Sequence, residues 1–261
     1  MGTVMLPDRV GLRALARILG SIDGATRFVG GAVRDMLAGE PIKDIDLATK
    51  LEPHEVTARL QKARIKAVPT GIAHGTVTAV LSSGPVEVTT LRRDVSTDGR
   101  RATIAYTDDW REDAARRDFT INALYADPET VELFDYFGGE SDLTAGLVRF
   151  IGEPLQRIAE DHLRILRFFR FHARFGKGAP DPASLKACGE RANDLMALSR
   201  ERIADELLKL LALPRPVETV RLMLSTGIFL PVLPEIITAE GLAALVAIED
   251  SPDPVRRLAR D

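Results

Sequence analysis

Two aspartates one residue apart, Asp44 and Asp46, are the first residues in this sequence whose types and spacing suggest chemistry. In an extended strand, residues two apart point to the same side, so both carboxylates would face one point. Two like charges this close repel each other unless a cation lies between them. Hard divalent ions such as Mg²⁺ are held by one or two carboxylates together with substrate phosphates, and paired ions can stabilise an in-line displacement at phosphorus. The alternative is a solvated turn, which is the commoner context of a lone Asp-x-Asp.

A glycine pair, Gly30 and Gly31, precedes AVRDML, which has the pattern of a helix start. Because glycine has no Cβ, the backbone N–H groups at such a helix start can approach phosphate oxygens closely. Arg34 lies one turn into this helix and is placed to reach the same phosphates. A glycine pair alone is more often a plain turn, but next to two aspartates it indicates a site for a phosphate-bearing ligand.

A second group of chemically useful residues lies in the segment AEDHLRILRFFRF. If this segment is one helix, Glu160 and Asp161 lie four and three residues before Arg164 and share its face. A carboxylate acceptor beside a guanidinium donor fits the Watson–Crick edges of cytosine and adenine, whereas guanine and uracil present the opposite pattern. Each mismatched buried group would cost about 1 to 3 kcal/mol. The alternative is a surface helix stabilised by ion pairs at the same spacing.

The elements that must position these residues divide the chain into two parts. In the first part, helix and strand patterns alternate. Helices are predicted around residues 8–19, from residue 31 and at 53–62, and strands at 27–29, 44–49, 75–81 and 86–91, the last two forming a hairpin. From about Leu155 onward the pattern is helical almost throughout. We therefore predict an α+β part at 1–150 and an all-helical part at 151–261.

The segment from Arg92 to Arg111 is long, polar and poorly periodic. We predict that it forms a mobile loop with a short strand near 102–106. Loops of this length in a compact domain usually serve a function.

The composition indicates a globular protein, because the 261 residues are 45% hydrophobic and 28% charged. The one cysteine cannot form an internal disulfide, and no apolar run of signal-peptide length starts the chain, so we expect a reducing, cytoplasmic location. We expect no membrane association, since no uninterrupted apolar stretch approaches about 20 residues. The formal net charge of -3 does not by itself indicate a nucleic-acid-binding protein, although a local basic surface is compatible with it.

Six segments occur in a recognisable order: GGAVRD followed by DID, VEVTTLRRD, ARRDFTINAL, FDYFGGESDLTAG, AEDHLRILRFFRF and RERIADEL. Together they resemble the class II tRNA CCA-adding enzymes and bacterial poly(A) polymerases, a branch of the polymerase-beta-type nucleotidyltransferase superfamily. The resemblance covers roughly residues 27–213. It implies a polymerase-beta-type nucleotidyltransferase head with a mixed sheet, followed by an all-helical neck and body.

The resemblance also implies a role for individual residues. The catalytic carboxylates would be Asp44 and Asp46, which hold the metal ions, with Glu87 as a third. The residues implied to bind the nucleotide are Gly30, Gly31, Arg34, Arg117, Asp118, Asn122, Glu160, Asp161, Arg164, Arg167 and Arg170. Of these, Arg117 would touch the triphosphate or ribose, and Asp161 and Arg164 would read the incoming base.

The activity implied is the Mg²⁺-dependent addition of C and A residues, from CTP and ATP, to the 3′ end of tRNA. In the resembling enzymes a flexible loop at the position of 92–111 helps the pocket switch from CTP to ATP. Relatives continue through further helices that grip the tRNA, so we expect this chain to be truncated. A poly(A) polymerase, a CC-only or A-only enzyme, and a non-catalytic nucleotide- or RNA-binding fragment remain as alternatives.

Overall fold

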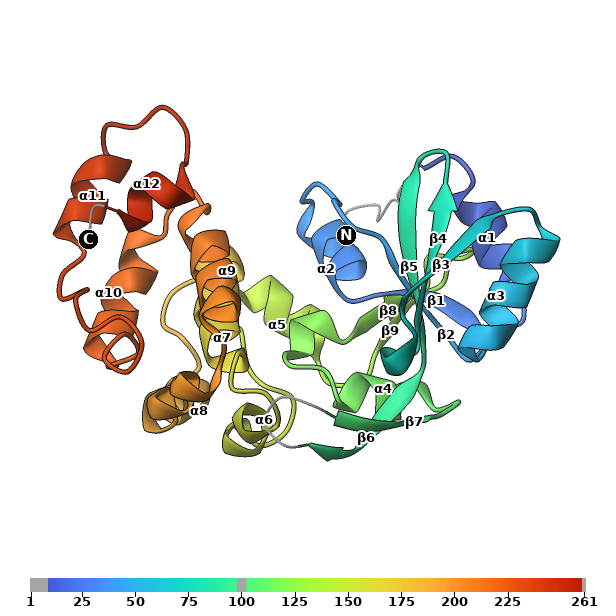
Figure 1. The fold of residues 1–261 in the computed structure, drawn as a ribbon, viewed down its shortest axis with the longest axis horizontal. Helices are drawn as coiled ribbons and strands as arrows, with labels where there is room; N and C mark the ends of the chain where they lie inside the picture. The colour runs from blue at the N-terminus through green and yellow to red at the C-terminus, as the bar shows by residue number, and fades with distance from the viewer. Residues whose placement is uncertain (1–8, 98–101, 260–261) are drawn as a thin grey trace. The chain divides into compact units, whose positions relative to one another are not determined.

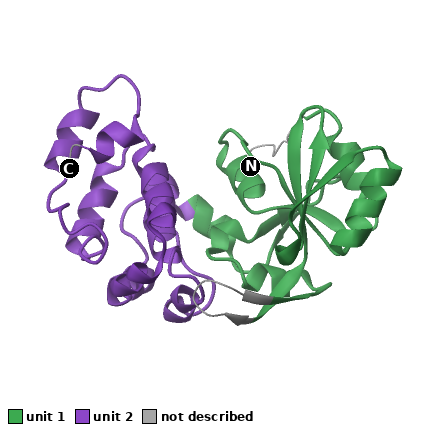
Figure 2. Ribbon diagram, viewed as in Figure 1, with its two compact units in different colours: residues 1–96, 102–144 green, residues 97–101, 145–261 purple. Residues whose placement is uncertain are grey.

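The computed structural model describes residues 9–97 and 102–259. The chain forms two compact units, one of residues 1–96 and 102–144 and the other of residues 97–101 and 145–261 (Figure 2). We call the first unit the head and the second the helical unit. The compact units divide near residue 145, and a functional boundary at residue 150 stays a prediction.

The head is built on a mixed seven-stranded sheet, as the resemblance implied. Its order is β3-β4-β5-β2-β1-β8-β9 (Figure 1). The strands are β1 Thr26–Val29, β2 Asp46–Thr49, β3 Lys66–Gly71, β4 Thr76–Leu81, β5 Gly84–Thr90, β8 Leu124–Ala126 and β9 Leu133–Asp135. Strands β2 and β5 are parallel, whereas the other neighbouring strands pair antiparallel. The predicted β4–β5 hairpin is confirmed, but β3, β8 and β9 were not predicted.

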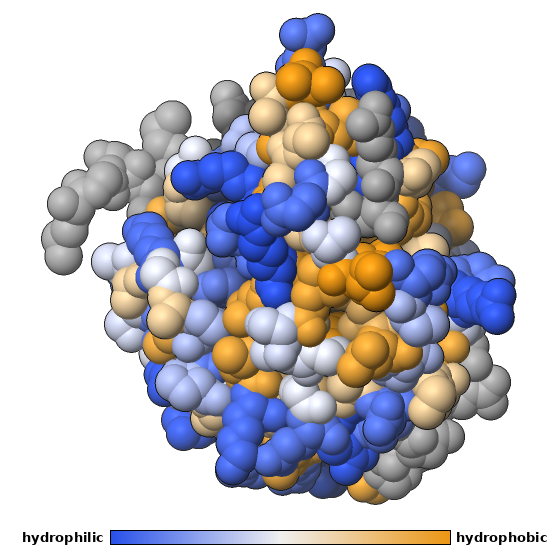
Figure 3. All heavy atoms as spheres, turned by 90° about the vertical axis from the view of Figure 1, so that its left-hand side faces the viewer, coloured by the Kyte–Doolittle hydropathy of each residue, from blue (hydrophilic) through white to orange (hydrophobic). Residues whose placement is uncertain are grey.

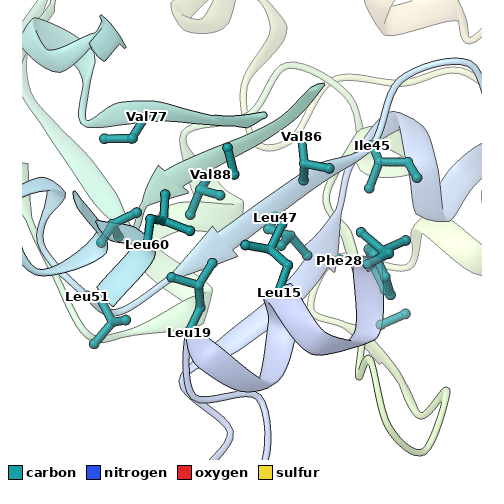
Figure 4. Close-up of a cluster of buried hydrophobic side chains, with 14 of the residues drawn as sticks. Leu15, Leu19, Phe28, Ile45, Leu47, Leu51, Leu60, Val77, Val86 and Val88 are labelled. Carbon is teal, nitrogen blue, oxygen red and sulfur yellow. The ribbon is translucent and has the colours of Figure 1, made fainter. Parts of the chain in front are cut away.

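Helices cover the apolar face of this sheet. They are α1 Leu12–Ile18, α2 Gly31–Ala38 and α3 Pro53–Lys62, and further along the head lie the short η1 Ile72–His74, α4 Trp110–Ala115, η2 Thr120–Asn122 and α5 Gly139–Ala145. Leu15 of α1 and Leu60 of α3 pack with Leu47 of β2 and Val88 of β5 in one buried cluster (Figure 4). Since side chains alternate along a strand, the neighbours of Leu47 and Val88 point to the opposite face.

The segment predicted as a mobile loop is for the most part regular structure. Strands β6 Arg92–Thr97 and β7 Ala102–Tyr106 form a separate two-stranded sheet, and α4 begins at Trp110. The predicted strand near 102–106 is confirmed, but the prediction of a loop over 92–97 is wrong, because these residues form a strand that pairs with β7. Residues 98–101 lie outside the described residues. We call β6 and β7 the arm.

From residue 145 onward, the regular elements that the structure describes in the second unit are helices. Its elements are α6 Pro154–Glu160, α7 Arg164–Phe175, α8 Pro182–Glu190, η3 Ala192–Ala197, α9 Arg200–Leu211, α10 Val217–Ser225, α11 Glu240–Val246 and α12 Pro254–Leu258. Phe168 and Phe169 of α7 are fully buried. One face of the molecule mixes hydrophilic and hydrophobic side chains (Figure 3). Within the described residues, no helix is both long and apolar enough to cross a membrane.

Candidate active site

Two carboxylates of the head lie on neighbouring strands at the same level. Asp46 of β2 and Glu87 of β5 are register partners in the parallel pair. Leu47 and Val88, the next residues along, belong to the buried core, so Asp46 and Glu87 face away from it. Glu87 is exposed and Asp46 is partly buried. The sheet therefore presents a pair of acids on its open face.

Asp44 lies just outside the strand, which corrects the prediction of a strand over 44–49. The first residue of β2 that pairs with β5 is Asp46. At this end of the ladder, Glu87 N donates to the Ile45 carbonyl at 3.2 Å. Asp44 is exposed. It is still close enough to act on Asp46 electrostatically.

The charge state of Asp46 reflects this crowding. Burial, the neighbouring Glu87 carboxylate and, to a smaller extent, Asp44 together raise the pKa of Asp46 to about 6, while Arg117 opposes the shift. An acid cluster whose charges disfavour one another fits a bound divalent cation. Among the described residues no three Asp, Glu, His or Cys side chains form a ready-made metal cluster, so substrate phosphate oxygens would have to complete the coordination. That ligand set is the one Mg²⁺ prefers.

The start of α2 is shaped by Gly30. Its φ of 65° and ψ of −122° fall in a region that residues with a Cβ avoid. A Cβ built on Gly30 would lie 3.3 Å from Nη1 of Arg117. The guanidinium of Arg117 therefore packs against the backbone at the N-terminus of α2, where Gly31 begins the helix. A positive side chain and a helix N-terminus in one place favour an anion.

Arg34 is held in a buried network within the head. Its Nε donates to Asp35 at 2.8 Å, and its Nη1 donates to the side-chain oxygen of Asn122. The amide of Asn122 donates in turn to Asp118 at 3.0 Å, and Asp118 also accepts from the Phe119 backbone at 2.8 Å. Arg34, Asp118 and Asn122 are thus brought together, as expected of one site, and each is less than a tenth exposed.

Arg117 is oriented by two partners that sequence reasoning missed. Its Nη2 donates to Asp113 at 3.1 Å and its Nε to the Tyr125 hydroxyl at 3.3 Å. Although burial opposes its charge, the pKa of Arg117 is raised by Tyr125 and Asp113. The missed signal was spacing, because Asp113 precedes Arg117 by four residues, which places both on one side of a helical turn.

The second group of predicted residues belongs to the helical unit, where the expected single helix is broken. Helix α6 ends at Glu160, Asp161 is extended with φ −152° and ψ 108°, and α7 begins only at Arg164. The reason is local, since Asp161 Oδ1 accepts from Leu163 N at 3.1 Å and so caps the new turn. The prediction that Asp161 and Arg164 share one helical face is therefore wrong.

Glu160 and Arg164 nevertheless meet, because Arg164 Nη1 donates to Glu160 at 2.7 Å and to the Arg157 carbonyl at 3.1 Å. Asp161 instead accepts from Arg202 of α9, with both carboxylate oxygens 3.1 Å from Nη2. Nη1 of Arg202 is buried, and it has no hydrogen-bond partner within residues 9–97 and 102–259. Asp161 and Arg164 are thus each held by another residue of the helical unit.

Arg167 and Arg170 follow Arg164 at three-residue steps along α7. Arg170 Nε donates to Glu206 of α9 at 2.6 Å, and Arg167 lies 3.9 Å from the same carboxylate. Glu206 is buried, with only 3% of its surface exposed. The segment RERIADEL therefore supplies two contact residues. Arg202 binds Asp161, and Glu206 binds Arg170 and lies near Arg167.

A mixed sheet with paired acids on its open face, beside a glycine-led helix N-terminus and an arginine, defines a nucleotidyltransferase head. Residues 26–149 match the family described as the poly A polymerase head domain, and residues 179–239 match a probable RNA and SrmB-binding site of polymerase A. The chain belongs to the class II tRNA CCA-adding enzyme and bacterial poly(A) polymerase family, which confirms the resemblance of its motifs.

Named relatives agree with this assignment. The human CCA tRNA nucleotidyltransferase 1, mitochondrial, is 46% identical over 204 residues, which cover 77% of this chain and 47% of the relative. The CCA-adding enzyme of Staphylococcus epidermidis is 38% identical over 186 residues, or 70% of this chain and 45% of the relative. The crystal structure of the Bacillus stearothermophilus CCA-adding enzyme in complex with CTP matches 92% of this chain and 58% of that one, with 33% identity and a TM-score of 0.76. The chain thus spans about half the length of these curated relatives.

Proposed function

We propose that this protein adds C and A residues, taken from CTP and ATP, to the 3′ end of tRNA. The observation that carries the proposal is the Asp46–Glu87 pair on the open face of the head, next to Arg117 and the N-terminus of α2. Nucleotidyl transfer needs acids that bind a cation and an anion site for the triphosphate, and this face supplies both. Relatives named as CCA-adding enzymes support the choice of reaction.

In the proposed mechanism, Asp44 and Asp46 hold Mg²⁺, with Glu87 as the adjoining carboxylate. Of two divalent ions held there, one would lower the proton affinity of the RNA 3′-hydroxyl and the other would neutralise the departing pyrophosphate. Arg117 and the first N–H groups of α2 bind the triphosphate, so that the α-phosphate is presented to the attacking hydroxyl. No covalent enzyme intermediate is required.

Selection of the base is assigned to the helical unit. Asp161 accepts a hydrogen bond from the exocyclic amino group that cytosine and adenine share, and Arg164 donates to the neighbouring ring acceptor. Glu160, Arg167 and Arg170 keep this surface charged and ordered. Guanine and uracil carry a carbonyl where the amino group is needed, so they would set a second acceptor against the Asp161 carboxylate.

The match to a poly A polymerase head domain favours one second candidate, a poly(A) polymerase that shares the same head. Partial CC- or A-adding enzymes share this head as well.

A cytoplasmic location is also a proposal, since the human relative is named as mitochondrial.

Sequencing of extended tRNA ends separates these activities. The chain is incubated with Mg²⁺ and a tRNA that ends at the discriminator base, with CTP, ATP or both, and the 3′ ends are read. We expect CC from CTP alone and CCA from the pair, and no extension in EDTA or by Asp46→Ala. Long A tracts would identify a poly(A) polymerase, and no extension under any condition would leave only a nucleotide-binding protein.

A further inference from the structure

Asp113 of α4 is a buried carboxylate, 1% exposed, that collects donors from four residues of the head. Its Oδ2 accepts from Nη2 of Arg117 at 3.1 Å and from the Tyr125 hydroxyl at 2.7 Å. Its Oδ1 accepts from Nε of Arg116 at 2.9 Å and from the backbone N of Arg92 at 3.2 Å.

The charges explain why an aspartate is needed here. Arg116 and Arg117 are adjacent in sequence, and their guanidinium groups share this one carboxylate. Burial by itself would raise the pKa of Asp113, but these two guanidinium groups hold that pKa well below its usual range. Asp113 is therefore ionised at any working pH. Charge-assisted hydrogen bonds of this kind fix the direction of a guanidinium more tightly than neutral ones.

The direction in which Arg117 is fixed matters for the head site. One nitrogen of Arg117, Nη2, is held by Asp113, while Nη1 is the atom that a Cβ on Gly30 would meet at 3.3 Å. Arg117 also lowers the pKa of Asp46 by its charge. Asp113 thus holds one terminal nitrogen of the guanidinium, while the other lies beside Gly30 at the N-terminus of α2.

The same carboxylate anchors the base of the arm. Arg92, whose N–H it accepts, is the first residue of β6, and the Arg92 carbonyl accepts from Nε of Arg116 at 3.1 Å. After β7, the N–H of Thr107 donates to the Leu91 carbonyl at 3.0 Å. The first strand of the arm and the triphosphate arginine are consequently tied to one side chain.

We propose that Asp113 is a positioning residue that holds Arg117 for the triphosphate and couples it to the base of the β6–β7 arm. The proposal rests on the function proposed above only through the assignment of Arg117 to phosphate. Asp113 itself touches no reactant, because its oxygens are turned to the four protein donors.

The test is a double-mutant cycle with a ligand that lacks a base and a ribose. Binding of inorganic tripolyphosphate in Mg²⁺ is measured by calorimetry for the wild type, Asp113→Asn, Arg117→Ala and the double variant. Asparagine keeps the shape and one acceptor oxygen but removes the charge. We expect Asp113→Asn to weaken binding about fivefold to tenfold in the wild type and less than about twofold in the Arg117→Ala background.

A matched control guards against loss of stability. Asp142→Asn changes another buried aspartate of the head, whose carboxylate accepts from Thr120 at 2.6 Å. Asp142→Asn should lower the melting temperature without weakening the binding of tripolyphosphate. Tyr125→Phe, which deletes one donor to Asp113, should weaken binding in the same direction as Asp113→Asn but by less.

Equal losses from Asp113→Asn in both backgrounds would overturn the proposal, because Asp113 would then act independently of Arg117. A wild type that does not bind tripolyphosphate overturns it as well, since Arg117 would not be a phosphate ligand. If the coupling is found but no tRNA is extended, the positioning role stands and the proposed function fails. The two ideas therefore fail by different measurements.

Discussion

Asp46 and Glu87, 41 positions apart in the sequence, are register partners on the parallel strands β2 and β5. Their side chains point away from the core that Leu47 and Val88 help to form. Without a cation the two carboxylates repel each other, and the partial burial of Asp46 increases the penalty. The head therefore carries a local instability that a bound metal would relieve.

The first prediction concerns this instability. Since the pKa of Asp46 is raised from 3.8 to about 6 in the folded protein, its ionised form destabilises the fold, and that loss develops as the pH rises through about 6. Asp46→Asn should thus stabilise the metal-free protein at pH 8 by about 1 kcal/mol, after allowance for solvent screening. The gain should shrink at pH 4.5, where Asp46 is protonated in the folded wild type. Urea unfolding in EDTA at both pH values measures this.

Asp44→Asn serves as the comparison in the same experiment, because Asp44 is exposed and its replacement should change stability little. Both Asp44→Ala and Asp46→Ala should nevertheless abolish nucleotide transfer. More than a tenth of wild-type activity in either alanine variant would exclude the assignment of that residue as a metal ligand.

The second prediction concerns Gly30. Gly30→Ala should destabilise the head by about 1 to 3 kcal/mol, since alanine avoids the backbone conformation of Gly30. It should also weaken the binding of tripolyphosphate, because the new Cβ would crowd Arg117. Gly39→Ala is the control. Gly39 also has a positive φ, of 69°, but a Cβ there would have no atom within 4 Å. Equal effects of the two changes on tripolyphosphate binding would show that the contact with Arg117 is irrelevant.

The third prediction concerns base choice. Asp161→Ala and Arg164→Ala should each raise incorporation of UMP and GMP relative to CMP and AMP, because one half of the hydrogen-bonding pattern is lost. Extension of a tRNA with each nucleotide triphosphate separately gives the ratios. A proportional loss for all four nucleotides would mean that Glu160, Asp161 and Arg164 serve only as ion pairs.

Arg202→Gln extends the same experiment. Arg202 contacts Asp161 through a bridge of 3.1 Å, so its loss should relax base choice in the same direction but more weakly. Arg221→Gln, which breaks exposed ion pairs of α10 to Glu218 and Glu240, is a control that should leave the ratios unchanged.

The fourth prediction concerns the arm. Shortening the segment Val95–Thr107 should spare addition of C and reduce addition of A severely, because the arm forms a sheet of its own and can reorganise around a site without loss of the core. Two single-nucleotide assays measure this, one on tRNA awaiting its first C and one on tRNA that already ends in CC. Equal losses in both assays would contradict a switching role and favour a poly(A) or C-only enzyme.

Much of this protein follows from its sequence alone. The ordered motifs identified the family, and local patterns predicted α3 and the β4–β5 hairpin within a residue or two. Such features depend on capping residues, turn residues and apolar spacing, all of which act over a few positions. The proximity of Gly31 and Arg34 followed in the same way, since they lie three positions apart, and a Cβ on Gly31 would be 3.6 Å from Arg34 Nη2.

Only the tertiary structure decided which distant residues meet. The register that sets Glu87 beside Asp46 depends on burying Leu47 and Val88 together, and no local pattern encodes that choice. The break at Asp161 was hidden because the segment has helical spacing, while a capping hydrogen bond and the ion pair with Arg202 override it. The bond from Arg92 to Asp113 likewise requires the arm to fold back on α4. Local spacing thus sets the elements, whereas burial and charge pairing over long separations assemble the site.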